Sequence, residues 1–212
     1  MTNLENQLTE KLESLVNKTA LSITDQQKEQ LVKLVLLLNK WNKAYNLTSV
    51  RDPMDMLVKH ILDSIVVSPY LQGKTFIDVG TGPGLPGLPL AIINPDKEFV
   101  LLDSLGKRIS FIRNAIRELG LTNVKPVLSR VEEYTVQQFD GIISRAFASL
   151  KDMTDLCQHL PNENGIFYAL KGQIHLDEIS QISKIFKIQD QIKLYIPDLI
   201  GERYLVLLNK SE

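Results

Sequence analysis

The chain has 212 residues, 44% of them hydrophobic and 23% charged, which is enough apolar material for one folded domain with a modest extension. Its formal net charge of −1 predicts no general attraction to nucleic acid or to an acidic membrane, so an RNA partner would have to be held by a local basic patch. A single cysteine, Cys157, excludes an internal disulfide. Because no signal-peptide core and no apolar stretch of roughly 18 residues is found, we expect a cytoplasmic protein without a membrane span.

The first part of the chain has the apolar period of helices. Leucines recur at helical spacing between residues 4 and 16, and again between residues 31 and 41. Asp52 followed by Pro53 then forms a typical helix start. No strand pattern precedes residue 75, so we predict a helical N-terminal extension or cap over residues 1–72.

The pattern changes after Gly73. Short apolar runs alternate with helical segments, which predicts a parallel sheet covered on both faces. The predicted strands before the C-terminus cover residues 75–79, 98–103, 124–128, 139–144 and 165–170. Residues 187–196 and 203–208 are separated by too short a loop for a helical crossover, so they should form an antiparallel hairpin. Residues 73–212 are therefore predicted to be a Rossmann-like α/β domain with a mostly parallel seven-stranded sheet.

A glycine-rich turn follows the first predicted strand, at Asp78-Val-Gly-Thr-Gly-Pro-Gly84. Gly80, Gly82 and Gly84 allow positive φ and a close approach of the backbone to a ligand, at the strand end where open α/β sheets bind ligands. No Gly-Lys-Ser/Thr follows, which excludes a Walker loop. Leu85 stands where a dinucleotide fingerprint has glycine, which weakens a nicotinamide site without excluding it.

Acidic residues near the strand ends favour S-adenosylmethionine as the ligand. Asp78 suits an ammonium group and would repel a pyrophosphate, whereas Asp103 at the end of the second strand could accept hydrogen bonds from ribose hydroxyls. Glu132 could face adenine. The alternatives are a plain helix cap for Asp103 and a solvated acid for Glu132. Free amides at the next helix start are expected to face the ligand, namely those of Leu85, Gly87 and Leu88.

The residues after the fourth strand bear on the type of methyl transfer. Methylation of exocyclic amines usually needs an Asn/Asp-Pro-Pro-aromatic motif, but the chain has Ser144-Arg-Ala-Phe-Ala148. Methylation of pyrimidine carbon-5 needs a nucleophilic cysteine, and Cys157 lies in a pattern typical of a buried helix face. A purine N7 attacks with its own lone pair, so that chemistry needs no general base. Arg145 could bind the methionine carboxylate or guanine O6, or pair with Asp78 or another acid at the sheet end.

Basic residues gather in one segment of this otherwise neutral chain. Between Leu105 and Arg130 there are six basic residues and only one acid, Glu118. Lys107 and Arg108 lie beside the expected ligand mouth and are candidates for RNA phosphate, as is Lys171 at the end of the fifth strand. A solvated surface is the alternative for all three. His60 and Asp63 have a spacing that favours a structural hydrogen bond on one helix.

The sequence resembles the RsmG (GidB) family of bacterial 16S rRNA guanine-N7 methyltransferases. The resemblance covers almost the whole chain, and it rests on Trp41–Thr48, His60–Ser64, Asp78–Gly87, Leu102–Arg108, Ser144–Ala146 and Leu170–Gly172. It implies a class I methyltransferase fold with a helical cap. It also implies that the protein methylates N7 of a guanine in the 530 loop of 16S rRNA.

The resemblance also implies a set of cofactor-binding residues. Taken with the residues argued above, the expected S-adenosylmethionine pocket comprises Asp78, Gly80, Gly82, Gly84, Leu85, Asp103, Ser104, Leu105, Val131, Glu132 and Arg145. Val131 departs from the family, which often has alanine there, but a backbone contact to adenine would survive the change. We expect no metal ion, a monomer, and a partner that is 16S rRNA or the small ribosomal subunit.

The sequence is also compatible with three other functions. They are a small-molecule methyltransferase with the same cofactor, a nicotinamide oxidoreductase, and a non-catalytic RNA-binding protein of ribosome assembly.

Overall fold

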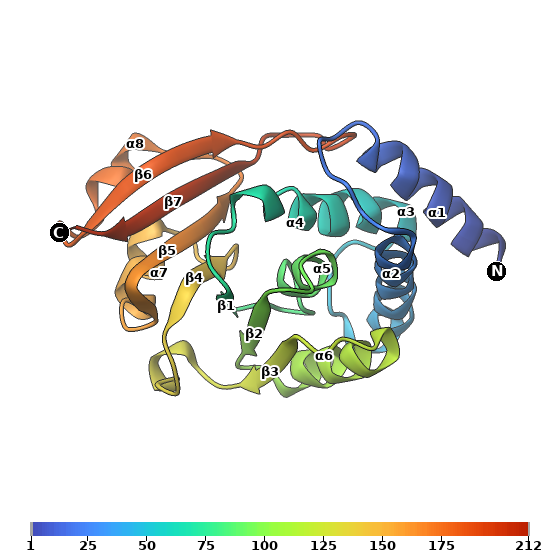
Figure 1. The fold of residues 1–212 in the computed structure, drawn as a ribbon, viewed down its shortest axis with the longest axis horizontal. Coiled ribbons are helices and arrows are strands. Elements are labelled where there is room, and N and C mark those ends of the chain that lie inside the picture. The colour runs from blue at the N-terminus through green and yellow to red at the C-terminus, as the bar shows by residue number, and fades with distance from the viewer. Residues whose placement is uncertain (1, 212) are drawn as a thin grey trace.

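The computed structural model describes residues 2–211, which form one seven-stranded sheet with helices on both faces (Figure 1). The strands are β1 (Thr75–Val79), β2 (Glu98–Asp103), β3 (Val124–Leu128), β4 (Phe139–Ser144), β5 (Pro161–Lys171), β6 (Phe186–Lys193) and β7 (Tyr204–Lys210). Their order in the sheet is β3-β2-β1-β4-β5-β7-β6. The first five pair in parallel, whereas β7 pairs antiparallel with both β5 and β6. This arrangement confirms the predicted fold class.

The N-terminal part is helical, as predicted. It comprises α1 (Asn3–Val16), α2 (Asp25–Tyr45), α3 (Pro53–Met56), a π-helical turn (Leu57–Leu62), α4 (Asp63–Ile65) and a 3-10 turn (Ser68–Tyr70). Capping boxes fix the starts of the two long helices, since Thr2 pairs with Glu5 and Thr24 with Gln27. Asp52 caps α3 through the amide of Met54. None of the described helices is both long and apolar enough to cross a membrane.

Alternate residues of the strands enter two hydrophobic cores, one on each face of the sheet. Phe76 and Leu101 enter the larger core, which also holds α5 (Gly87–Ile93), α6 (Gly106–Leu119) and the N-terminal helices. Ile77 and Val100 enter the other, which α7 (Leu150–Cys157) covers. Burial on both faces is typical of parallel strands. The remaining short helices are a 3-10 turn (Val131–Glu133) and α8 (Leu176–Ser180).

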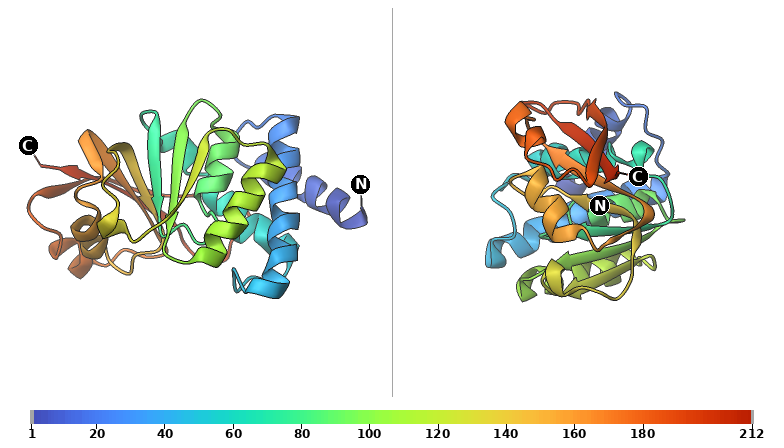
Figure 2. Two further views of the ribbon diagram at one scale, coloured as in Figure 1. Left: turned by 90° about the horizontal axis from the view of Figure 1, so that it is seen from below. Right: turned by 90° about the vertical axis from the view of Figure 1, so that its left-hand side faces the viewer.

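The N-terminal helices pack directly on the helices of the sheet. Figure 2 shows α2 alongside α6, where Gln30 and Lys33 donate hydrogen bonds to carbonyls at the end of α6. Because one core continues from these helices into the sheet, a domain boundary between residues 72 and 73 stays a prediction.

Some element bounds differ from those predicted. β5 begins at Pro161 rather than residue 165, because Pro161 already pairs with Phe139 of β4. β6 ends at Lys193 rather than residue 196, and the chain then leaves the sheet in a loop that returns at Tyr204. These differences concern pairing between distant strands, which the local apolar pattern does not encode.

Candidate active site

The glycine turn after β1 needs left-handed backbone at three positions. Gly80, Gly82 and Gly84 have φ values of 67°, 61° and 92°. A Cβ atom on Gly84 would lie 2.4 Å from Leu88, so the turn packs tightly on the following helix. A Cβ atom on Gly82 would meet no atom within 4 Å. Gly82 therefore faces open space, which is the arrangement that lets a ligand approach the backbone.

Asp78 holds this turn closed. Its Oδ2 atom accepts hydrogen bonds from the Thr81 hydroxyl at 2.6 Å and the Gly87 amide at 2.8 Å. Burial is the main cause that raises the pKa of Asp78 to about 7. Its Oδ1 atom is buried and has no hydrogen-bond partner among residues 2–211.

The amides expected to face a ligand are instead used within the turn, and that expectation is wrong. Leu85 donates to the carbonyl of Thr81 at 2.9 Å, Leu88 donates to Gly84 at 2.7 Å, and Gly87 donates to Asp78. The side chain of Leu85 is buried in the larger core. The tight turn satisfies these amides internally because the helix begins only at Gly87.

A cavity of about 430 Å³ lies at the carboxyl ends of β1, β2 and β3. It is lined by Val79, Gly80, Leu102, Asp103, Ser104, Arg108, Ser129, Arg130, Val131, Glu132, Ala146 and Phe147. Among the predicted cofactor residues, Gly80, Asp103, Ser104, Val131 and Glu132 thus come together. Asp78, Gly82, Gly84, Leu85, Leu105 and Arg145 lie outside this lining.

We call this cavity the cofactor cavity, after the ligand expected from the sequence, and its most strongly fixed polar group is Asp103. It accepts hydrogen bonds from the amides of Gly82 at 2.9 Å and Leu105 at 3.0 Å, and it pairs with Arg108 at 3.2 Å. Arg108 Nη1 is shared between the two oxygens of Asp103, at 3.2 Å from Oδ2 and 3.5 Å from Oδ1, so a hydroxyl can take the place of the longer contact. Glu132 offers a second carboxylate, while Val131 and Phe147 provide apolar walls. The volume and the mixed lining fit a nucleoside.

A second cavity, of about 510 Å³, lies beside the first. It is lined by Val50, Lys59, His60, Asp63, Arg145, Leu170, Lys171, Gly172, Leu199, Ile200 and Arg203. Three distant parts of the chain contribute: the N-terminal helices, the ends of β4 and β5, and the loop before β7. Arg145 lines this cavity and its neighbour Ala146 lines the cofactor cavity, so both cavities border the segment that follows β4.

Asp63 joins two arginines in the second cavity. Its Oδ2 atom lies 3.1 Å from Arg145 Nη1, and its Oδ1 atom lies 3.0 Å from Arg203 Nε. The partner of Arg145 is therefore an acid of the helical segment and not Asp78 or another acid at the sheet end. Sequence reasoning missed Arg203 altogether, and it pointed to Asp63 only through the spacing from His60 and the resemblance at His60–Ser64.

His60 does not pair with Asp63, contrary to the expectation from their spacing. Its Nε2 atom lies 2.8 Å from the Thr48 hydroxyl, and its Nδ1 atom is buried without a partner in the described chain. Burial, helped by the positive charge of Arg145, lowers the pKa of His60 to about 4. The ring is therefore neutral near pH 7.

The three candidates for RNA phosphate have different surroundings. Lys107 is exposed and donates to the carbonyl of Tyr45 at 3.2 Å. Arg108 faces the cofactor cavity, bound to Asp103. Lys171 is bound by Glu178 and by the carbonyl of Ala148, each at 2.8 Å, so its charge is largely neutralised.

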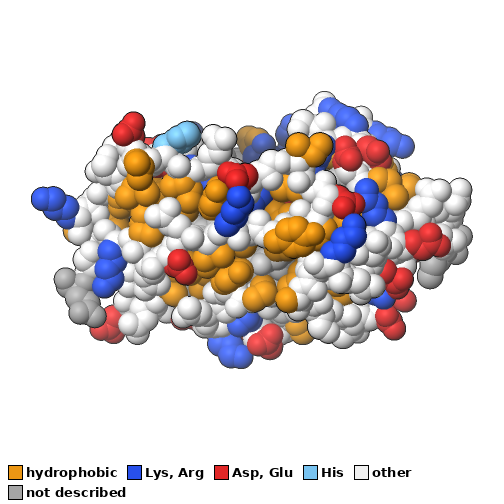
Figure 3. Space-filling view, turned by 90° about the horizontal axis from the view of Figure 1, so that it is seen from above, with side chains coloured by type: hydrophobic (Ala, Val, Ile, Leu, Met, Phe, Trp, Pro, Cys, Tyr) orange, Lys and Arg blue, Asp and Glu red, His pale blue; other side chains and the backbone are white. Residues whose placement is uncertain are grey.

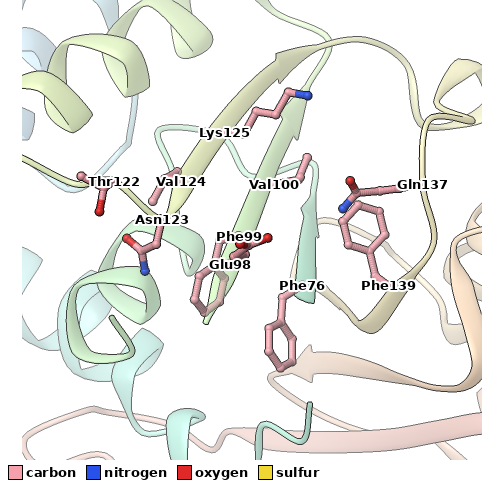
Figure 4. Close-up of a pocket in the computed structure, with 10 residues that line it drawn as sticks. All are labelled: Phe76, Glu98, Phe99, Val100, Thr122, Asn123, Val124, Lys125, Gln137 and Phe139. Carbon is pink, nitrogen blue, oxygen red and sulfur yellow. The ribbon is translucent and has the colours of Figure 1, made fainter. Parts of the chain in front are cut away.

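A smaller cavity, of about 170 Å³, lies at the opposite edge of the sheet, where the strands begin (Figure 4). The stacked rings of Phe76 and Phe99 form part of its wall, with centroids 5.4 Å apart. Asn123 lines it too, but its amide is used by the carbonyls of Ala91, Asn94 and Lys97. Ligands of open α/β sheets bind at the carboxyl ends of strands, so we assign no function to this cavity.

Comparison with known proteins gives the family. Residues 27–206 match the family model described as "GidB: rRNA small subunit methyltransferase G". The chain is 77% identical over 209 residues to the ribosomal RNA small subunit methyltransferase G of Pasteurella multocida, covering 98% of this chain and 100% of the relative. It is 74% identical over 208 residues to the protein of that name in Mannheimia succiniciproducens, covering 98% of each.

Solved structures share the fold at low sequence identity. A ribosomal protein L11 methylase from Lactobacillus delbrueckii subsp. bulgaricus superposes with a TM-score of 0.56 at 16% identity, covering 71% of this chain and 77% of that one. A SAM-dependent methyltransferase from Aquifex aeolicus also gives 0.56, at 14% identity, covering 77% and 96%. The chain therefore has the class I S-adenosylmethionine-dependent methyltransferase fold.

Proposed function

The chain belongs to the rRNA small subunit methyltransferase G family, and on that premise we propose that it transfers a methyl group from S-adenosylmethionine to N7 of a guanine in the 530 loop of 16S rRNA. The observation that carries the proposal is the presence of two cavities bordered by the consecutive residues Arg145 and Ala146. One suits a nucleoside cofactor, and the other is rich in cationic side chains.

The residues of the cofactor cavity fit S-adenosylmethionine. Asp103 would accept hydrogen bonds from the ribose, Glu132 would face the adenine edge, and Gly80 and Gly82 would let the methionine part approach the backbone. Asp78 would act mainly by closing the turn, with its unpartnered Oδ1 atom left for the ammonium group. When bound, S-adenosylmethionine supplies a methyl group on a positively charged sulfur.

Guanine N7 attacks with its own lone pair, so no residue has to remove a proton. The neutral His60 ring agrees with this, because a pKa of about 4 takes it out of the range in which a base would work near pH 7. Arg145 is the group that we expect to orient the base. Its guanidinium can donate to guanine O6 and thereby orient N7 toward the methyl group, while Asp63 fixes its plane.

The substrate is best tested by mass mapping of methylated nucleotides in small-subunit RNA. Deletion of the gene should remove one 7-methylguanosine from the 530 loop, and the purified protein should restore it with S-adenosylmethionine. Loss of a methyl group at another nucleotide would overturn the assignment of the target. Methylation of small molecules but never of RNA would favour a small-molecule enzyme. Unchanged RNA methylation together with defective subunits would favour a non-catalytic assembly protein.

The proposal also gives the setting of the reaction. The partner is 16S rRNA or the small ribosomal subunit, which is made in the cytoplasm, and we propose that the protein acts there as a monomer. Gel filtration with light scattering would test the monomer.

A further inference from the structure

The charge of the second cavity is not balanced. Lys59 is paired with Asp55 at 3.0 Å and Lys171 with Glu178 at 2.8 Å. Arg145 and Arg203, in contrast, share the single carboxylate of Asp63. Two guanidinium groups against one carboxylate leave one positive charge beside the cavity. The side chains of Arg145 and Arg203 are only 25% and 32% exposed, so this charge is partly shielded from water.

Free donors of both arginines remain. Arg203 uses Nε for Asp63 and Nη1 for the carbonyl of Glu202 at 3.0 Å, and its Nη2 atom has no partner among residues 2–211. Arg145 bonds Asp63 through Nη1 alone, within the same described range. Asp63 thus fixes two planar groups and leaves N–H donors available to an incoming acceptor.

The two arginines lie at different places in the cavity. Arg145 is next to Ala146, which lines the cofactor cavity, so it is nearer the methyl donor. Arg203 lies at the end of the loop before β7, and it also lines a neighbouring hollow of about 480 Å³. A chain that leaves the acceptor site along these hollows would therefore pass Arg203.

We propose that Arg203 binds a backbone phosphate of the RNA beside the acceptor nucleotide, with Asp63 holding its guanidinium in place. The inference rests on the proposed function and adds a binding residue to it. A guanidinium fixed by a carboxylate presents its remaining donors in the fork geometry that matches a phosphate. Figure 3 shows basic and acidic side chains scattered over the face seen from above, with no large area of one charge. Affinity for RNA on such a surface has to come from a few well-placed contacts.

Salt dependence measures phosphate contacts separately from chemistry. The affinity of each variant for the small ribosomal subunit from the deletion strain would be measured between 50 and 250 mM salt. The slope of log K against log salt would then be compared with that of the wild-type protein. Arg203→Gln should weaken binding about tenfold, and it should reduce the slope of log K against log salt by about 0.7 to 1. The control is Lys187→Gln, which removes the same charge. Lys187 is exposed and lies opposite Asn209 in the strand register, at the end of the hairpin away from Arg203. The Lys187→Gln variant should therefore keep the salt slope of the wild type.

Two further variants separate charge from geometry. Arg203→Lys keeps the charge and should keep the slope, but it should lower affinity about threefold because an ammonium lacks the planar fork. Asp63→Asn keeps both arginine charges, so the slope should not decrease, although the rate of methyl transfer should fall as Arg145 loses its support. An unchanged slope in Arg203→Gln, or a smaller slope in Asp63→Asn, would overturn the proposal.

A measurement with the wild-type protein covers the case in which Arg203→Gln fails to fold. Small-subunit RNA with one uncharged methylphosphonate linkage beside the acceptor guanosine should show the same reduction in slope, and an unchanged slope would overturn the contact. The methylphosphonate is placed beside the guanosine that mass mapping identifies, and the salt slopes of the variants do not depend on which nucleotide that is. A methyl group found elsewhere would overturn the proposed target without altering the salt slopes, and unchanged slopes would leave the target as it stands.

Discussion

The cofactor cavity and the second cavity both border the segment that follows β4, yet they are built differently. The cofactor cavity consists of loops that directly follow β1, β2, β3 and β4. Its fixed acid, Asp103, is held by amides of two such loops, those of Gly82 and Leu105. The second cavity instead needs the N-terminal helices and the C-terminal hairpin as well as the sheet. Its fixed acid, Asp63, is held by side chains 82 and 140 residues away.

This difference separates binding of the cofactor from placement of the acceptor. Substitutions in the glycine turn should abolish cofactor binding and leave the second cavity intact. Substitutions around Asp63 should do the reverse, with little effect on the cofactor. A variant that affects both equally would show that the cavities do not work independently.

The largest effect is expected for Gly82→Val. The φ of 61° disfavours a β-branched residue, and the side chain would enter the open space that we assign to the cofactor. Affinity for S-adenosylmethionine, measured by calorimetry, should fall by about 100-fold or more while the protein stays folded. Gly201→Val is a matched control, because Gly201 has a φ of 104° and open space around it but lies in the loop before β7. Unchanged affinity in Gly82→Val would contradict the placement of the cofactor.

Arg145 should show the opposite behaviour. Arg145→Lys should lower the single-turnover rate about tenfold, and Arg145→Ala about 100-fold, because neither reproduces the planar double donor. Affinity for S-adenosylmethionine should change by no more than about threefold. The rate should stay nearly flat between about pH 6 and 9 in all three proteins, since no proton has to be removed. A large loss of cofactor affinity would instead assign Arg145 to the methionine carboxylate.

The buried His60, which lines the second cavity, makes the free energy of unfolding of the protein depend on pH. Its pKa is lowered from 6.5 to about 4 in the folded state, so the unfolded chain binds the proton more tightly. The associated stability is complete above pH 6.5 and is lost as the pH falls toward 4. Asp78, whose pKa is raised to about 7, acts in the opposite direction, so His60 is isolated by comparing wild type with His60→Gln. In urea titrations, the free energy of unfolding of the wild type relative to His60→Gln should fall by about 2 kcal/mol between pH 7 and pH 5. Comparison with a variant of the exposed His175 should show no such change.

The smallest effect is expected at the rim of the cofactor cavity. Lys107→Glu should weaken binding to the small subunit about threefold and flatten its salt dependence, without changing cofactor affinity. Arg108→Glu should behave differently, because a second carboxylate beside Asp103 would disturb the cofactor cavity. Equal loss of cofactor affinity in both variants would contradict the assignment of Lys107 to RNA and Arg108 to the cofactor cavity.

Much of the cofactor cavity could be predicted from the sequence, because the patterns that specify its strands and its glycine turn are local. The change from a helical to a strand period gave β1 to β4 within a few residues, and the spacing of Gly80, Gly82 and Gly84 indicated a ligand turn. Leu85 shows the limit of such reasoning. Its place in the motif suggested a ligand contact, but the internal hydrogen bonds of the turn and the packing of its side chain direct it into the core.

Local patterns along the chain were sufficient to predict the α/β fold, the helical N-terminal segment, the antiparallel C-terminal hairpin and the position of the glycine turn. Apolar period, caps and turn residues act within about ten positions along the chain. Three sets of contacts could not be predicted in this way: Asp63 binds Arg145 and Arg203, His60 lies next to the Thr48 hydroxyl, and Glu178 neutralises Lys171. These pairs join helices, strand ends and a hairpin loop that meet only after the elements have packed, and no local pattern specifies which charged side chains will then face each other.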